Sequence, residues 1–177
     1  MKIRTVVTGH DPQGKTCVCA DREVEATTVP LMPGYGFHML WSTADVPVFP
    51  DDGSPAPCPT YFPPVGGSRF LMFTIPAQRT APPAGTDLAQ AADQTRQALP
   101  GLLEVMEPDA PGMHRSNTID YVFVLEGEIV LELDNGRETT LRTGDVAVQN
   151  GTRHAWRNRS GKPVRMLVCM AGARHTD

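Results

Sequence analysis

The sequence lacks any long apolar run and any strong excess of charge. No window in its 177 residues approaches the ~18 apolar residues of a membrane-spanning helix. No signal-peptide run follows the charged start Met1 to Arg4 either. The formal net charge of -4 argues against nucleic-acid and anionic-membrane partners, because proteins that bind these usually carry a basic face. We therefore expect a cytoplasmic protein with no nucleic-acid and no membrane partner.

Cysteine is also scarce, and its spacing excludes a zinc finger. The four cysteines are Cys17, Cys19, Cys58 and Cys169. Cys17 and Cys19 are two positions apart, so a strand would place both thiols on one face. We expect ordinary reduced thiols rather than a disulfide or a metal site. The sequence contains no internal repeats and no acidic or basic tail.

Proline and glycine, by contrast, are abundant, with 17 and 16 residues, which predicts many turns and few long helices. The apolar fraction of 40% and charged fraction of 20% are typical of one globular domain. β-Rich runs at 3–8 and 16–20 predict a hairpin, and further strands are expected at 69–75, 119–125 and 163–170. Residues 46–67 are proline-rich and should be irregular. One helix is predicted over 87–99, capped by Thr86, and a short strand over 102–106.

Evenly spaced short strands with turn signals favour an all-β antiparallel sandwich or barrel. We divide the chain into a β-rich N-terminal arm over residues 1–65, a barrel over 66–172 and a tail over 173–177. The arm is expected to wrap the barrel or a partner subunit.

The run 119–125 is apolar on both faces when it is placed as a strand. Asp120, Val122 and Val124 alternate with Tyr121, Phe123 and Leu125. The outer face then needs a cover, either the arm or a second subunit, and we predict a homodimer. A carboxylate on the inner face would be costly to bury alone, so Asp120 should be paired, protonated or bound to a cation.

Two histidines flank this strand in the sequence. His154, Trp156 and Asn158 share one face of their own predicted strand. If that face is interior, His154 and His114 can meet Asp120 across the barrel. Two imidazoles and one carboxylate suit a divalent metal such as Fe, Zn, Mn or Ni, with open positions for a substrate. The same three residues are our candidate catalytic groups.

The spacing of these residues resembles the two motifs of the cupin superfamily. His114-x-Ser116-x3-Asp120-x6-Gly127 is similar to the first motif, and Gly144-x4-Gln149-x-Gly151-x2-His154-x3-Asn158 to the second, with 16 residues between Gly127 and Gly144. The resemblance implies a double-stranded β-helix, or jelly roll, whose interior opens at one end onto a site. By position, His114, Asp120 and His154 correspond to motif ligands, and Ser116 stands where the family has another histidine.

The resemblance and the residue types together predict a small-molecule enzyme. Its chemistry would be that of a lyase, dehydratase, decarboxylase or isomerase, with Asp120 and His154 as an acid/base pair or with a metal polarising a carbonyl. An iron-dependent dioxygenase is an alternative, because two histidines and a carboxylate can hold iron. A non-catalytic small-ligand-binding protein is another. Ser116, Val122 and Trp156 are the candidate substrate contacts.

Overall fold

The computed structural model describes residues 1–78 and 81–176. The described residues form ten β-strands, one α-helix and two short 3-10 turns. The strands are β1 (Lys2–His10), β2 (Thr16–Glu25), β3 (Gly36–Thr43), β4 (Ser68–Ile75), β5 (Thr118–Glu126), β6 (Glu128–Glu132), β7 (Glu138–Arg142), β8 (Val146–Asn150), β9 (Ala155–Arg157) and β10 (Val164–Gly172). The helix is α1 (Leu88–Ala98), and the turns are η1 (Leu103–Val105) and η2 (Asp134–Gly136).

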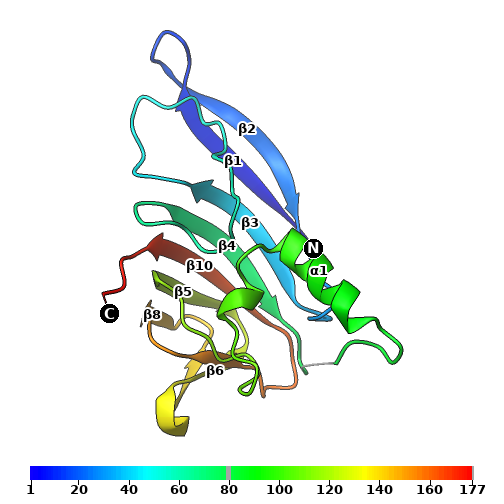
Figure 1. Ribbon diagram of the computed structural model, residues 1–177. Helices are drawn as coiled ribbons and strands as arrows, with labels where there is room; N and C mark the ends of the chain where they lie inside the picture. Colours follow the sequence, from blue (N-terminus) through cyan, green and yellow to red (C-terminus); the bar gives the residue numbers. More distant parts are fainter. Residues whose placement is uncertain (79–80, 177) are drawn as a thin grey trace.

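Two antiparallel sheets make up the barrel. The larger has the order β3-β4-β10-β5-β8 and the smaller the order β7-β6-β9. The core contains Leu71 from β4, Val124 from β5, Ile129 from β6 and Met166 from β10, all almost fully buried. This arrangement confirms the predicted all-β fold, a double-stranded β-helix. Helix α1 and η1 lie on one side of the larger sheet (Figure 1).

Strand β5 shows the predicted alternation of side chains. Val122 and Val124 are buried on its inner face, whereas Tyr121 and Phe123 on its outer face are exposed. The strand ends at Gly127, whose φ of 93° suits glycine, and an added Cβ would lie 3.0 Å from Val164 Cγ2. The tight turn into β6 therefore requires a residue without a side chain.

The N-terminal region contains two different parts. Strands β1 and β2 pair as the predicted hairpin, which extends away beyond β3 in line with the larger sheet (Figure 1). Strand β3 falls within the predicted arm 1–65, yet it pairs along its length with β4 and belongs to the larger sheet. We use "arm" below for residues 2–25 alone.

Two local predictions were wrong. Asp87 caps α1 in place of Thr86, because its Oδ1 accepts hydrogen bonds from the amides of Ala89 and Gln90. The Thr86 hydroxyl instead donates to the Pro83 carbonyl. The predicted strand at 102–106 is the 3-10 turn η1, and only its end, Met106, forms a β-bridge, with His114. Among the described residues, no helix is long and apolar enough to span a membrane.

Candidate functional site

The structure brings the rings of His114 and His154 into contact in a tilted arrangement. An isolated antiparallel bridge joins the two residues, with each amide donating to the other's carbonyl at 3.0 and 2.9 Å. Their ring centroids are 4.3 Å apart and the rings are inclined by 48°. Phe62 flanks His114 at 6.4 Å and Trp156 meets His154 edge-on at 5.9 Å. The two imidazoles therefore occupy the middle of a row of four rings.

Backbone carbonyls hold both imidazoles through Nδ1. His114 Nδ1 lies 3.1 Å from the Gly112 carbonyl, so this nitrogen carries the proton and donates. Nε2 of the neutral ring then carries the lone pair, and no hydrogen bond from the described residues reaches it. This tautomer makes His114 a proton acceptor through Nε2.

His154 is fixed more tightly than His114. Its Nδ1 lies 2.9 Å from both the Thr152 carbonyl and Gln149 Nε2. Gln149 Nε2 also donates to the Thr152 carbonyl at 2.8 Å. The Thr152 carbonyl thus accepts from both His154 Nδ1 and Gln149 Nε2, and this shared acceptor sets the orientation of the His154 ring, which lies against one side of His114.

Both imidazoles are held in the neutral form. Burial lowers the pKa of His114, and the Gly112 carbonyl and Glu107 only partly offset it. Burial, with a smaller contribution from His114, lowers the pKa of His154 to about 4. At neutral pH the pair therefore presents two uncharged rings, a state suited to accepting a proton.

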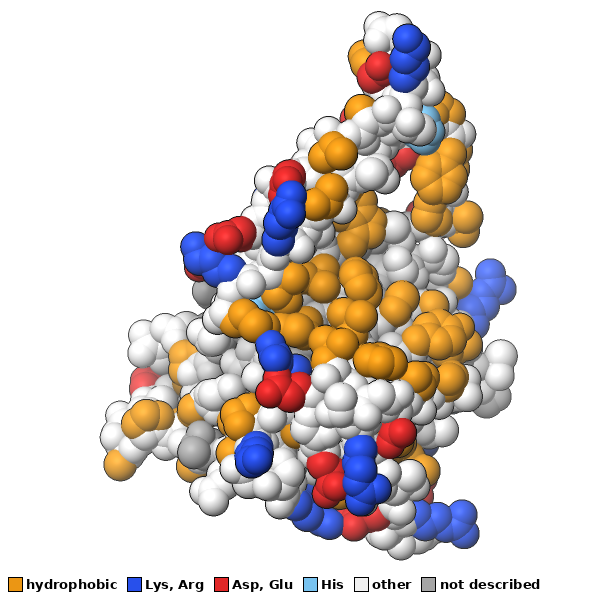
Figure 2. Space-filling model, turned by 180° about the vertical axis from the view of Figure 1, so that it is seen from behind, with side chains coloured by type: hydrophobic (Ala, Val, Ile, Leu, Met, Phe, Trp, Pro, Cys, Tyr) orange, Lys and Arg blue, Asp and Glu red, His pale blue; other side chains and the backbone are white. Residues whose placement is uncertain are grey.

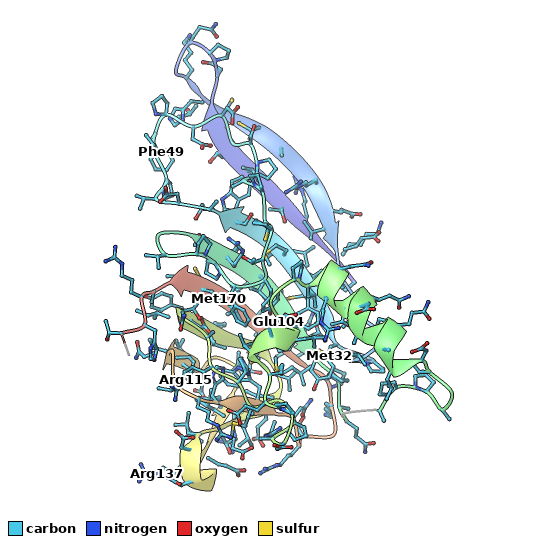
Figure 3. All side chains as sticks on the ribbon, in the orientation of Figure 1. Met32, Phe49, Glu104, Arg115, Arg137 and Met170 are labelled. Atoms are coloured by element: carbon cyan, nitrogen blue, oxygen red, sulfur yellow. The ribbon has the colours of Figure 1, made fainter. Side chains whose placement is uncertain are left out.

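A cavity of about 500 Å³ opens beside His114. Its wall is mainly apolar and combines Leu31, Met32 and Tyr35, from the segment before β3, with Phe73, Met106 and Trp156. Figure 3 labels Met32 on the side of the larger sheet where α1 lies. The volume is within the range of small-molecule sites.

The charged groups of this wall are held by other residues. Glu107 accepts two hydrogen bonds of 2.6 Å from Arg153. Arg157 pairs with Glu132, and Arg159 pairs with Glu138. These ion pairs fix the rim of the cavity, whereas Nε2 of His114, which also lines the cavity, has no hydrogen-bond partner among the described residues.

A second set of buried polar residues includes Arg69 and Asp120. Asp120 has no hydrogen bond to either histidine among the described residues, although it lies opposite Gln149, whose amide lies 2.9 Å from His154 Nδ1. Asp120 lies on β5 opposite Met170 of β10, and Arg69 of β4 lies opposite Met170 on its other side.

Burial raises the pKa of Asp120 to about 6, and a hydrogen bond from Thr118 partly offsets this shift. Burial and the nearby Asp120 carboxylate raise the pKa of Tyr61.

This second group leaves two buried polar atoms without hydrogen-bond partners among the described residues, Asp120 Oδ1 and Arg69 Nη2. Arg69 is fully buried and donates to the carbonyls of Thr60, Thr43 and Ser68 at 2.8–3.1 Å. The sequence predicts that Asp120 is paired, protonated or bound to a cation. The raised pKa favours the protonated state.

The predicted metal ligands do not form one group. Within residues 1–78 and 81–176, no three His, Cys, Asp or Glu side chains are arranged so that they could hold a metal ion. His114 and His154 face each other, whereas the charge of Asp120 acts on Tyr61 and Cys169. The side chains present therefore do not fit a three-ligand centre, and metal binding stays a prediction.

The predicted substrate contacts lie in three different environments. Trp156 is in the cavity wall beside His114. The Ser116 hydroxyl is buried against Thr118 at 2.8 Å, and Val122 is in the hydrophobic core. Core side chains cover the inner face of β5, so Val122 does not line the cavity beside His114.

Several residues of the site were missed in the sequence. Gln149 was visible within the second motif, but its contact with His154 depends on a turn of five residues. The segment around Met32 carried no chemical signal, because apolar residues before a strand are usually core. Arg69 was visible as a cation inside an apolar strand, which is an unusual place for a charge.

Comparisons with known proteins agree with this architecture. Residues 102–170 match the family model described as "Cupin domain". Phomopsin biosynthesis cluster protein C' of Diaporthe leptostromiformis is 62% identical over 48 residues, 27% of this chain and 25% of that protein. Oryzines biosynthesis cluster protein J of Aspergillus oryzae is 35% identical over 105 residues, 54% of this chain and 59% of that protein.

A third relative carries a name that refers to activity. The cupin-domain-containing oxidoreductase virC of Hypocrea virens is 45% identical over 58 residues, 31% of this chain and 30% of that protein. The matched regions thus span from about a quarter to 59% of the length of these curated relatives.

Proposed function

We propose, from the match of residues 102–170 to the cupin family model, that the protein is an enzyme that moves a proton on a small, mainly apolar organic molecule. The substrate would bind in the cavity of about 500 Å³ beside His114. The reaction class is that of an isomerase or a lyase. The observation that carries the proposal is the neutral His114 ring, whose Nδ1 is held by the Gly112 carbonyl.

In this proposal His114 is the general base. Its Nε2 would accept a proton from a carbon next to a carbonyl group, and the Nδ1–H···O bond to Gly112 would become stronger as the ring becomes positive. His154 is a positioning residue that supports the His114 ring from one side. The apolar wall would hold the substrate carbon against Nε2, and the proton on Nε2 would exchange with solvent before a proton returns to the carbon.

Hydrogen–deuterium exchange tests this function directly. A set of cyclic and phenyl ketones would first be screened for quenching of Trp156 fluorescence in a Trp41→Phe background, because Trp156 lies in the cavity wall. Compounds that quench would then be incubated with the protein in D2O and analysed by mass spectrometry. We expect deuterium next to the carbonyl, with a rate reduced by about 10²-fold or more in His114→Gln.

A matched control is His10→Gln, which removes an imidazole from the arm, far from the cavity in sequence and structure. It should leave the exchange rate unchanged. Equal rates for wild type and His114→Gln, with compounds that quench Trp156, would exclude His114 as the base. Quenching without any exchange would instead favour the non-catalytic binding protein.

An oxidoreductase is a second candidate, favoured by the name of the Hypocrea virens relative. Oxygen uptake would be measured with the same ketones after incubation of the protein with iron(II), alongside metal analysis of wild type, His114→Ala and His154→Ala. Uptake that needs both iron and the two histidines would support an iron-dependent dioxygenase over the proton-transfer enzyme.

A further inference from the structure

The arm carries a pair of thiols in contact with each other. Strand β2 places Cys17 and Cys19 on one face, and their Sγ atoms lie 3.6 Å apart in a thiol–thiol hydrogen bond. Both side chains are exposed. The arm projects beyond the rest of the molecule (Figure 1, Figure 2), and neither thiol lines the cavity beside His114. The proton transfer proposed for His114 therefore does not involve this pair.

The contact between the two sulfurs depends on an irregularity of the hairpin. The register of β1 and β2 shifts between Val7 and Thr8, so that Cys19 has no partner on β1. Such a bulge bends the strand and changes the direction of the side chain at the extra residue. The proximity of the sulfurs is thus set by the backbone of the hairpin.

A loop packs against the hairpin beside Cys19. The His10 amide donates to the Asp51 carbonyl at 2.7 Å, which anchors this loop on the end of β1. Gly9 and Gly53 permit the close approach, because a Cβ added to either glycine would lie 2.8 Å from a side-chain atom of Cys19. The loop therefore brings its own side chains, including two carboxylates, next to the thiol pair.

Negative charge surrounds the two thiols. Partial desolvation, the hydrogen bond with Cys17 and the carboxylates of Asp52 and Asp51 raise the pKa of the Cys19 thiol. A thiol held in the protonated form reacts slowly in disulfide formation, which proceeds through the thiolate. The same carboxylates would attract a cation, and a bound cation displaces thiol protons to solvent. These surroundings favour cation binding over oxidation.

We propose that Cys17 and Cys19 bind one thiophilic d10 cation, Cu(I) or Zn(II), between their sulfurs. Thiolates are the ligands that select these ions. Two zinc–sulfur bonds of ~2.3 Å to sulfurs 3.6 Å apart enclose an angle of roughly 100°, which is near the tetrahedral value. A disulfide would instead need the sulfurs to approach to ~2.05 Å. The pair therefore fits a bridging cation with little rearrangement.

The cation would have two protein ligands. In the part of the chain that the structure describes, no three His, Cys, Asp or Glu side chains are arranged to hold a metal ion, so water would complete the coordination. Asp51 Oδ1 and Asp52 Oδ1 accept hydrogen bonds from the amides of Gly53 and Ser54, and these carboxylates would contribute charge. The sequence predicted ordinary thiols because it did not show this loop beside them.

Anaerobic competition titrations of the reduced, full-length protein test the proposal. Cu(I) would be presented as its bicinchoninate complex and Zn(II) as its complex with 4-(2-pyridylazo)resorcinol, and the loss of absorbance would report transfer of each ion. We expect transfer of one equivalent per chain from at least one complex. Cys17→Ser and Cys19→Ser should each weaken binding by about 10²-fold or more, because the second thiolate no longer adds its high effective concentration. Both side chains are exposed, so the circular dichroism spectrum should not change.

Cys58→Ser is the matched control, since it removes an exposed thiol outside the hairpin, and it should bind the ion as wild type does. Asp52→Asn should weaken binding by roughly twofold to fivefold, because it removes a charge and keeps the acceptor for the Ser54 amide. Absence of stoichiometric transfer from both complexes, or equal affinities of wild type and Cys17→Ser, would overturn the proposal. Air oxidation to a Cys17–Cys19 disulfide, seen by intact mass without any cation transfer, would replace it with a redox role.

Discussion

The barrel contains two sets of buried polar side chains, which differ in their charge and in their hydrogen bonding. In the first, His114 and His154 remain uncharged, and backbone carbonyls hold their Nδ1 atoms. In the second, Asp120 and Arg69 retain ionisable or charged side chains, and each has one atom without a hydrogen-bond partner among the described residues. The first group borders a cavity, whereas the second is enclosed by the sheet. The comparison indicates that the accessible group is suited to chemistry and the enclosed group to structure.

The two groups also respond to pH in opposite directions. The lowered pKa values of the histidines mean that the unfolded chain binds protons that the folded chain does not. The stability they provide is therefore lost as pH falls below about 6.5, and for His154 the loss continues to about pH 4. The raised pKa of Asp120 has the reverse effect, since the folded chain holds the proton. Its penalty develops as pH rises from about 4 to about 6.

The largest effect is expected for Arg69→Met. The substitution removes the buried guanidinium that donates to the carbonyls of Thr43, Thr60 and Ser68. We expect the free energy of unfolding to fall by about 3–5 kcal/mol in urea titrations at pH 7. Arg69→Lys, which keeps the charge and part of the bonding, should lose less. A loss below about 1 kcal/mol in Arg69→Met would show that this group is not structural.

His154→Phe should change the pH dependence of stability by about 3 kcal/mol. The variant lacks the group whose pKa is lowered to about 4, so its free energy of unfolding should decline less than that of wild type between pH 6.5 and 4. Urea titrations at half-unit steps would measure this difference. His10→Phe, on the arm, is the comparison. If His154→Phe and wild type lose the same stability over this range, His154 does not carry the acid sensitivity.

Asp120→Asn should change the pH dependence of the free energy of unfolding in the opposite sense to His154→Phe, by about 2–3 kcal/mol. The amide cannot ionise, so the loss of stability between pH 4 and 6 caused by the raised pKa of Asp120 disappears. At pH 7 the variant should be more stable than wild type, as measured by thermal and urea unfolding. A destabilised variant at pH 7 would mean that the ionised carboxylate has a partner in solution, such as a cation.

Gln149→Leu should have the smallest effect on stability, about 1 kcal/mol, because it removes one amide hydrogen bond to the Thr152 carbonyl. Its influence should be larger on exchange activity, since Gln149 orients His154 and His154 supports His114. We expect kcat for ketone exchange to fall with little change in KM. Gln149→Glu, which places an acceptor oxygen against the Thr152 carbonyl, should lose at least as much activity. Unchanged kcat in both variants would remove Gln149 from the site.

The candidate site could be predicted only in part from the sequence. The motifs placed His114 and His154 correctly near each other, because both flank strands whose register is set by alternation and by glycine turns. Asp120 was placed on the correct face of β5 for the same reason. The prediction that Asp120 and the two histidines form one three-residue site was not supported. The distance between side chains across a barrel depends on how far each strand is offset from its neighbours.

The sequence by itself determined the all-β fold, the alternation of β5 and the apolar outer face, since these depend on residue spacing along one strand. The tertiary structure decided which polar groups meet and where the cavity opens. Met32 and Trp156 share that wall although 123 residues separate them in the sequence. No local pattern records such a contact, because it results from packing a distant segment against the barrel. The ring of His154, rather than a carboxylate, lies against His114 for the same reason.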